Sequence, residues 1–550
     1  MSLPTTTSSL RAWRGPALAA GIGLLLAVSC RSPEAFKTAA DDEVYPLVLR
    51  ERSRMGQDGD FTIEPNEESL REDLLRGEAE LTEPLDLLEL LDIAALNSRD
   101  YQTRKESVYQ AALEVTRQRW LLDGRGDLGV DASVSGSGST SETASVTPSA
   151  SLTRILGSGA SVVLGASWNF AKSLPDGSVS STVSGLFDIR QPLLRGYGRR
   201  ILGEPLTQSE RDLVYEVRAF ERFRRTFAFD VAQRMYRILQ QMNRVENELE
   251  NQQNLILLRQ RNEALSEAGR LSEIQVDQAR QDELRAENRV INAQVALGSQ
   301  LDDFKLFLGL PIEAELAIDP AELERLSGDA LDEVAPEEGE AIRFALRERL
   351  ELMTAFDQVV DAERRIGISA DALRMGLDLT ASLTSISSEP GQPFDFDLED
   401  LNWSVGASVD LPVNRLLERN VFRQAIITRN AAGRSAQQQQ DSVVADVRAD
   451  LRDLRAAREN YEIQTSAVAL ARRRIESTQL NLQAGRATTR DLLEAQDALV
   501  NAENDTTGAL IEYTLSRLGL FLDMERLHID ERGIQIAPSS EQALEPATTP

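Results

Sequence analysis

The chain has 550 residues and a formal net charge of −29, which is long for a single ordinary core and strongly acidic. An acidic surface disfavours a nucleic-acid partner, because phosphate binding requires clustered positive charge. One histidine and one cysteine exclude a disulfide within the monomer and any site built from several Cys and His ligands. Aromatic residues make up only 5% of the chain, and the abundance of Ala, Leu, Gln, Glu and Arg is typical of long helices.

The first residues look like a targeting segment rather than part of the fold. Two arginines precede the apolar run ALAAGIGLLLAVSC, which is too short to cross a membrane and ends at Cys30. AVSC resembles the cleavage motif of bacterial lipoproteins, with Ser29 in place and Ala27 where Leu is usual. We therefore expect a lipoprotein signal peptide and a lipidated Cys30. The alternative is an ordinary secretory signal with an incidental cysteine.

The first half of the chain combines a helix with alternating segments. An acidic leader (30–80), either a tether or a segment along the outer wall, precedes an amphipathic helix that begins near Pro84. Period-two alternation then predicts strands at 128–134 and 183–189, and further candidate strands lie around 146–170 with a role left open. One apolar face and one small polar face suit a transmembrane barrel, with lipid outside and water inside. A soluble sandwich fits the strands equally well.

A long helical hairpin follows these strands. No proline occurs between Leu206 and Leu308, and the apolar residues are spaced by three and four. At 1.5 Å per residue, the arm that leads to Gly269 would be roughly 100 Å long. Such a narrow apolar stripe requires neighbouring helices along its whole length. We expect Gly269 to form the turn at the far tip.

The second half has the same order of elements. After an amphipathic helix, alternation predicts strands at 377–384 and 401–411. A second proline-free hairpin runs from about Glu418 to Leu522, with Gly485 at its tip. The tail after Met524 has the composition of a disordered segment.

An internal repeat supports this division into two halves. LSEAGRLSEIQVDQARQDELRAEN (265–288) and NLQAGRATTRDLLEAQDALVNAEN (481–504) share an Ala-Gly-Arg corner and a closing Ala-Glu-Asn. The sequence thus predicts two tandem structural repeats. The expected segments are a signal peptide (1–29), the leader (30–80), a first repeat (81–310), an equatorial linker (311–338), a second repeat (339–525) and a disordered tail (526–550).

Taken together, these pieces resemble the TolC-type outer-membrane efflux protein family from about Leu81 to Met524. IRQPLLRGYGRR resembles the strand-to-helix passage of that family, VDLPVNRLLERN its counterpart in the second half, and AGRATTRDLLEAQDALVNAE the second hairpin tip. The resemblance implies an α+β membrane protein that forms a homotrimer. Each protomer would give four strands to a shared twelve-stranded barrel and two hairpins to a periplasmic α-barrel.

The resemblance also implies a function and a location. The protein would be the outer-membrane channel of a tripartite efflux or type I secretion system in a Gram-negative-type bacterium, anchored by lipid and extending into the periplasm. It would pass small molecules, ions or polypeptides from an inner-membrane pump and a periplasmic adaptor. It would need no cofactor or metal and would catalyse no reaction.

Family positions point to residues of a periplasmic aperture and to adaptor contacts at the hairpin tips. Asp491 and Glu494 match the acidic residues that ring the aperture, where three copies would favour cations. The first-hairpin equivalent of Asp491 is Gln275. The alternative is that these residues form an ordinary solvated helix face and that the tip glycines only relieve backbone strain. Candidate basic partners for the acids are Arg270, Arg486 and Arg490. The matching adaptor-contact residues are Gly269, Arg270, Leu271, Ser272, Gly485 and Arg486.

Two other classes of protein fit less well. An enzyme is disfavoured because His528 is the only histidine and no glycine-rich phosphate loop lies between a strand and a helix. A structural coiled-coil lipoprotein without transport activity explains the long helices. It does not explain two strand sets with Trp168 and Trp403 near candidate membrane interfaces.

Overall fold

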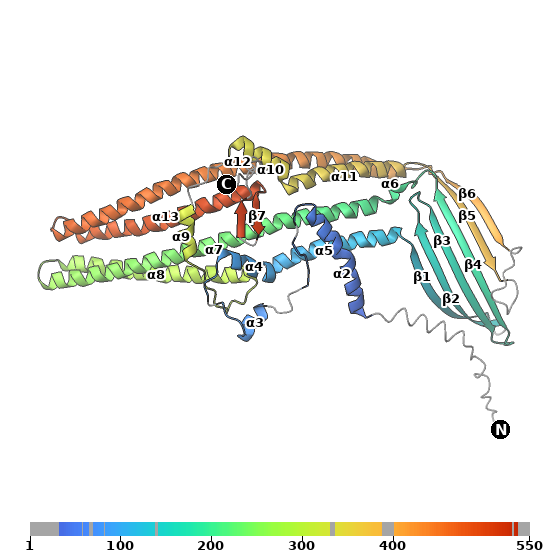
Figure 1. The fold of residues 1–550 in the computed structure, drawn as a ribbon, viewed down its shortest axis with the longest axis horizontal. Coiled ribbons are helices and arrows are strands. Elements are labelled where there is room, and N and C mark those ends of the chain that lie inside the picture. The colour runs from blue at the N-terminus through green and yellow to red at the C-terminus, as the bar shows by residue number, and fades with distance from the viewer. Residues whose placement is uncertain are drawn as a thin grey trace, which may run out of the picture.

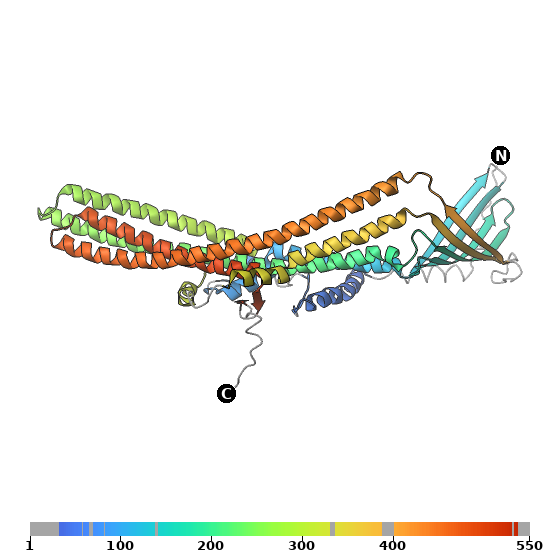
Figure 2. The same cartoon turned by 90° about the horizontal axis from the view of Figure 1, so that it is seen from above.

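The computed structural model describes residues 32–57, 59–64, 70–81, 83–137, 141–329, 336–387, 401–530 and 533–536. The molecule is a long rod of helices with an antiparallel sheet at one end and the tips of two helical hairpins at the other (Figures 1 and 2). Cys30 lies outside the described residues. Among the described helices, none is long and apolar enough to cross a membrane.

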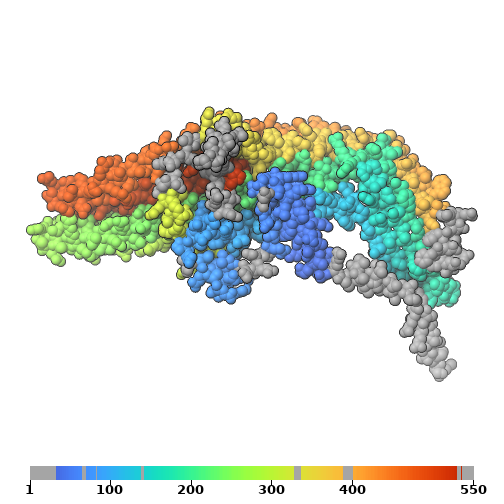
Figure 3. All heavy atoms as spheres, in the orientation of Figure 1, coloured from blue at the N-terminus to red at the C-terminus, as the bar shows by residue number. Residues whose placement is uncertain are grey.

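The leader packs on the side of the rod instead of hanging free as a tether. Its helix α2 (Pro33–Ser53) buries Val44 and Val48 in a cluster that contains residues of α5 and α7. A buried ion pair fixes the same helix, because Arg52 Nε lies 2.9 Å from Glu221 Oε1 of α7. In the space-filling view this N-terminal region forms a ridge on the middle of the rod (Figure 3). Along the chain α2 is followed by α3 (Leu70–Arg76), α4 (Leu87–Asn97) and α5 (Arg99–Leu122), and α7 (Glu204–Glu267) comes after the first four strands.

Six antiparallel strands form one sheet in the order β1-β2-β3-β4-β5-β6. The predicted strands are all present. The candidate region 146–170 supplies β2 and β3, so the sheet has six strands where the family resemblance implied four. The pairing of β4 with β5 joins the two halves of the chain. The strands are β1 (Arg125–Ser137), β2 (Ser141–Ile155), β3 (Ser161–Ser173), β4 (Val179–Pro192), β5 (Gly376–Ile386) and β6 (Asn402–Asp410).

Two long hairpins continue from the sheet and end side by side (Figures 1 and 2). After the short helix α6 (Arg199–Leu202), α7 and α8 (Glu273–Leu308) form the first hairpin. The second hairpin consists of α12 (Leu416–Gln483) and α13 (Thr489–Asp523). The same order of helix, strands and hairpin therefore occurs twice, with four strands in the first half and two in the second.

The main core lies at the middle of the rod, where α4, α7, α8 and α13 meet. Phe304 and Met235 are almost completely buried there. Around this level lie α9 (Ala321–Asp329), α10 (Glu338–Glu348) and α11 (Leu350–Ala372).

The structure differs from our expectation in the tail. The expected disordered segment begins at 526, but Leu527–Asp530 and Gly533–Ile536 pair as the strands β7 and β8. Leu527 is fully buried and Ile534 packs against the main core. This short hairpin is structured because its apolar side chains contact the rod, although the composition of the tail is polar. Residues 537–550 lie outside the described residues.

Candidate functional site

The first hairpin turns at Gly269, as its position predicted. The backbone N–H of Gly269 donates to the carbonyl of Ser266 and that of Arg270 to the carbonyl of Leu265, both at 2.8 Å. These two bonds are the Schellman arrangement that ends a helix. The φ angle of Gly269 is +72°. An L-residue with a Cβ rarely adopts this conformation, so the turn requires glycine.

The second tip repeats this geometry. Gly485 has a φ of +73°, and its N–H donates to the carbonyl of Leu482 at 3.0 Å. The Arg486 N–H donates to the carbonyl of Asn481 at 2.8 Å. The predicted adaptor-contact residues at both tips are exposed, except Leu271, which is half-buried. The two tips therefore have the same turn geometry, and both turns are exposed.

Asp491 begins the return helix of the second hairpin. Its carboxylate accepts the backbone N–H of Thr488 at 2.8 Å, and Thr488 Oγ1 accepts the N–H of Asp491 at 3.3 Å. This capping box satisfies backbone donors at the start of α13. The hydrogen bonds from Thr488 lower the pKa of the fully exposed Asp491 carboxyl below its usual value. Asp491 therefore remains ionised at neutral pH.

Glu494 lies one turn further along α13 and is also exposed. Its carboxylate accepts a hydrogen bond from Arg490 Nε at 3.1 Å and lies 4.0 Å from Arg474 Nη2 of α12. Of the three predicted basic partners, Arg490 thus contacts an acid, although the acid belongs to its own helix. Gln275 is half-buried near the start of α8, in the corresponding part of the first hairpin.

The helices of one protomer lie in a row that leaves two edges uncovered. In the tip half, α12 packs on α13, α13 on α7, and α7 on α8. Both α8 and α12 carry apolar side chains that are at least half exposed. The six of these side chains nearest the tips fall into pairs at equal distances along the chain from the two tip glycines, namely 5, 15 and 22 residues. These pairs are Ile274 with Leu480, Leu284 with Leu470, and Ile291 with Ile463.

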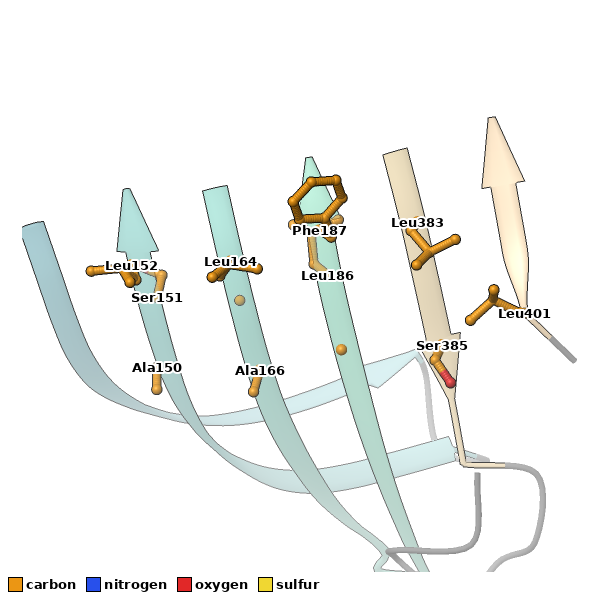
Figure 4. Close-up of a pocket in the computed structure, with 12 residues that line it drawn as sticks. Ala150, Ser151, Leu152, Leu164, Ala166, Leu186, Phe187, Leu383, Ser385 and Leu401 are labelled. Atoms are coloured by element: carbon orange, nitrogen blue, oxygen red, sulfur yellow. The ribbon is translucent and has the colours of Figure 1, made fainter. Parts of the chain in front are cut away.

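The sheet has an apolar face and a polar face. Cross-strand pairing puts Leu152, Leu164, Phe187, Leu383 and Trp403 in one row across β2 to β6. Figure 4 shows the first four of these side chains on successive strands, around a hollow that Ala150, Ala166 and Ser385 also line. Trp403 is 73% exposed. In one protomer this apolar face has no covering layer of helices (Figures 1 and 2).

Comparison with known proteins assigns the second half of the chain. Residues 341–522, from α10 to the end of α13, match the family model described as outer membrane efflux protein. This segment is an outer membrane efflux protein domain. No curated protein matches the sequence.

Solved structures with the same fold cover most of the chain, including the half that precedes the efflux protein domain. The channel CusC has a TM-score of 0.61 at 14% identity, over 81% of this chain and 93% of its own. The outer membrane channel CmeC of Campylobacter jejuni has a TM-score of 0.60 at 14% identity, over 88% and 97%. VceC of Vibrio cholerae has a TM-score of 0.58 at 13% identity, over 80% and 95%. Most of the chain therefore has the fold of these outer-membrane proteins.

A polar seam between α7 and α13 joins the efflux protein domain to the first half. Asn262 Nδ2 donates to Thr489 Oγ1 at 3.3 Å near the tips, where both side chains are buried. Further along, Arg289 of α8 bridges Glu248 of α7 (2.9 Å) and Asp497 of α13 (3.4 Å). Further contacts of the seam include Asn247–Asn504 (2.9 Å), Asn243–Thr507 (2.8 Å) and Arg237–Glu512 (2.7 Å).

Our sequence reasoning missed this seam. It took the polar contacts between the hairpins from the family resemblance, which pointed to the acids and arginines at the tips. The available signal was spacing. Asn243 and Asn247 continue, at four-residue steps, the helix face of the buried Leu239.

Within the described ranges, no three His, Cys, Asp or Glu side chains are grouped so that they could hold a metal ion. The acids of the tips are instead occupied by capping and ion pairing, as described above.

Proposed function

We propose that the chain is one protomer of a trimeric outer-membrane channel that carries solutes away from an inner-membrane pump and its periplasmic adaptor. The observation that carries this proposal is the pair of uncovered edges. One side of the protomer is formed by α12 and β6, and the other by α8, α5 and β1. Two unlike edges generate a head-to-tail contact, and such contacts form a ring when the rotation closes.

The helix edges fit each other in register. α8 runs away from the tips and α12 runs toward them, so a neighbour's α12 would lie antiparallel to α8. The three apolar pairs at equal distances from the tips would then face each other. Burying exposed Leu and Ile side chains contributes about 1.5–3 kcal/mol for each fully buried side chain.

The sheet edges require the same closure. β1 and β6 each have one neighbour in the protomer, and unpaired backbone groups are not tolerated in lipid. An even number of strands places β6 antiparallel to the β1 of the next copy. A closed barrel with the apolar face outward and the polar face inward would satisfy the backbone and cross the outer membrane.

The hairpin tips suit the periplasmic end of this channel. Their exposed turns would contact the adaptor, and the exposed Asp491 and Glu494 would form acidic rings near the aperture. Cargo would pass through the tunnel without chemical change. Drug efflux, metal efflux and polypeptide secretion share this requirement, and the cargo is chosen by the pump.

A lipid on Cys30 would add an anchor to the barrel. α2 begins at Pro33, three residues after Cys30, and it packs on α5, whose C-terminal end leads directly into β1. A lipidated cysteine would therefore be joined, through α2, to the helix that continues into the sheet. Mass spectrometry of the mature protein from membranes would show the added acyl chains, or an unmodified thiol that contradicts them.

Disulfide trapping tests the ring directly. We would introduce Leu284→Cys together with Leu470→Cys, which lie at the same level on opposite edges. The matched control combines Leu284→Cys with Leu480→Cys, displaced by ten residues or about 15 Å along the helix. Oxidation is expected to give covalent dimers and trimers for the first pair and monomers for the control. Monomers for both pairs would contradict the ring and favour the structural lipoprotein without transport activity.

A further inference from the structure

The strands β2 and β3 have the length and pairing of membrane-crossing strands. β2 has 15 residues and β3 has 13, whereas a tilted transmembrane strand needs about 9–11. β2 pairs along the length of β1, and β3 along that of β4. The two strands are therefore inserted within the sheet and are not an appendage at its outer end.

Both faces of the sheet continue across β2 and β3 without a change in character. On the apolar face, Leu152 of β2 and Leu164 of β3 lie in the same row as Leu383 of β5 and Trp403 of β6. A hairpin that lay in water outside the membrane would have no reason to present Leu side chains in this row.

Small polar side chains link the strands on the opposite face. Asn169 Nδ2 of β3 donates to Thr147 Oγ1 of β2 at 2.8 Å. Three cross-strand serine pairs on the same face share hydrogen bonds. These pairs are Ser133–Ser145 (2.9 Å), Ser167–Ser184 (2.7 Å) and Ser382–Ser404 (2.7 Å). Serine, threonine and asparagine on this face are suited to a water-filled lumen.

We propose that β2 and β3 cross the outer membrane with the other four strands, so that three copies build an eighteen-stranded barrel. This inference rests on the proposed trimeric channel. A strand spacing of ~4.8 Å and a tilt of ~40° give a diameter of about 36 Å for eighteen strands and about 24 Å for twelve. Barrels of 16–18 strands leave an aqueous channel, as porins do.

This wider barrel matches the tunnel below it. In the tip half each protomer presents α12, α13, α7 and α8 in one row, so a trimer has a ring of twelve helices. At about 9.5 Å between helix axes, that ring is also about 36 Å across. The membrane segment would then be as wide as the tunnel, and the size of cargo would be limited at the hairpin tips and not at the outer membrane.

Spin labels on β2 test whether this strand crosses the bilayer. Single variants Leu152→Cys and Ser151→Cys carry labels on the apolar and polar faces of β2. Leu383→Cys and Thr384→Cys are the matched controls, because they occupy the same two rows on β5. The parent chain, with Cys30 as its only cysteine, is the blank. Trimers in lipid vesicles are probed by collision with lipid-dissolved oxygen and with a water-soluble nickel complex.

We expect labels at Leu152 and Leu383 to collide mainly with oxygen, and those at Ser151 and Thr384 mainly with the nickel complex. If both β2 labels meet the nickel complex while β5 alternates, β2 and β3 lie outside the membrane and the inference is wrong, although the channel stands. If β5 does not alternate either, the proposed channel fails with it. In an image of the trimer in nanodiscs by electron cryomicroscopy, a barrel of eighteen strands would support the inference and a barrel of twelve would contradict it.

Discussion

The carboxyl group of Asp450 gives a pH-dependent prediction that can be worked from the structure. Asp450 lies on α12 at the middle of the rod, close to Asp523 at the end of α13. Asp523 Oδ1 is paired with Arg222 at 2.7 Å and with Arg349 at 3.5 Å. Burial and repulsion by Asp523 raise the pKa of Asp450 to about 7.

The sign and size of the effect follow from this raised pKa. Between about pH 4 and pH 7 the folded protein keeps a proton that the unfolded chain has lost, so folding stability falls as pH rises through this window. Raising this pKa from 3.8 to about 7 corresponds to about 4 kcal/mol of folding free energy. Asp450 is partly exposed, and screening by solvent reduces the effect to about 1–2 kcal/mol.

Asp450→Asn removes the group that titrates. At pH 8 the variant should be more stable than wild type by about 1–2 kcal/mol, and at pH 5 the two should be nearly equal. Thermal unfolding of the purified protein, followed by circular dichroism at 222 nm at both pH values, measures this difference. Asp441→Asn is the control, because Asp441 is exposed on the same helix and lies nine residues before Asp450. Equal Tm values for Asp450→Asn and wild type at pH 8 would refute the reasoning.

Three further predictions concern the tips and the core. Gly269→Ala should cost about 1–2 kcal/mol at the first tip and speed amide exchange there, whereas Gly298→Ala, in open space within α8, should stabilise its helix by about 0.5–1 kcal/mol. If the amides at the first tip exchanged at the same rate in Gly269→Ala and wild type, the φ of +72° at Gly269 would not require glycine. Phe304→Ala, at a site 1% exposed, should cost about 3–5 kcal/mol and lower Tm. Leu306 is 55% exposed, so Leu306→Ala should change stability by less than about 0.5 kcal/mol. If Phe304→Ala and Leu306→Ala lowered stability equally, the core would not lie at Phe304. Thr488→Ala should remove the capping box, cost about 1 kcal/mol and speed exchange in the first turn of α13; unchanged exchange would show that the cap contributes little.

Most of the fold could be predicted because the periodic patterns are long. Apolar spacing over more than sixty residues identifies α7 and α12. The tip glycines could be predicted because a residue with positive φ, usually glycine, ends the first arm of each hairpin. β2 was harder to define. Its Ser, Thr and Ala residues give weak contrast between faces, and Pro148 lies inside it, where a proline argues against a central strand.

The site was less predictable than the fold. From the sequence we predicted that Asp491 lines an aperture. In the structure its side chain also caps α13, a role that its spacing of three residues from Thr488 permits but does not establish. The seam between α7 and α13 depends on which faces two distant helices turn toward each other, and no local pattern encodes that choice. The short strands β7 and β8 form because the rod offers apolar contacts to Leu527 and Ile534, which the tail sequence alone does not reveal.

Single-channel conductance in a planar bilayer tests the central claim that this chain forms a channel. The comparison is wild type against Asp491→Asn/Glu494→Gln, which removes the charges while an amide can still cap α13. We predict discrete, cation-selective openings from verified wild-type trimers and a changed conductance or selectivity in the double variant. Verified trimers that never conduct, with or without the two substitutions, would contradict the account.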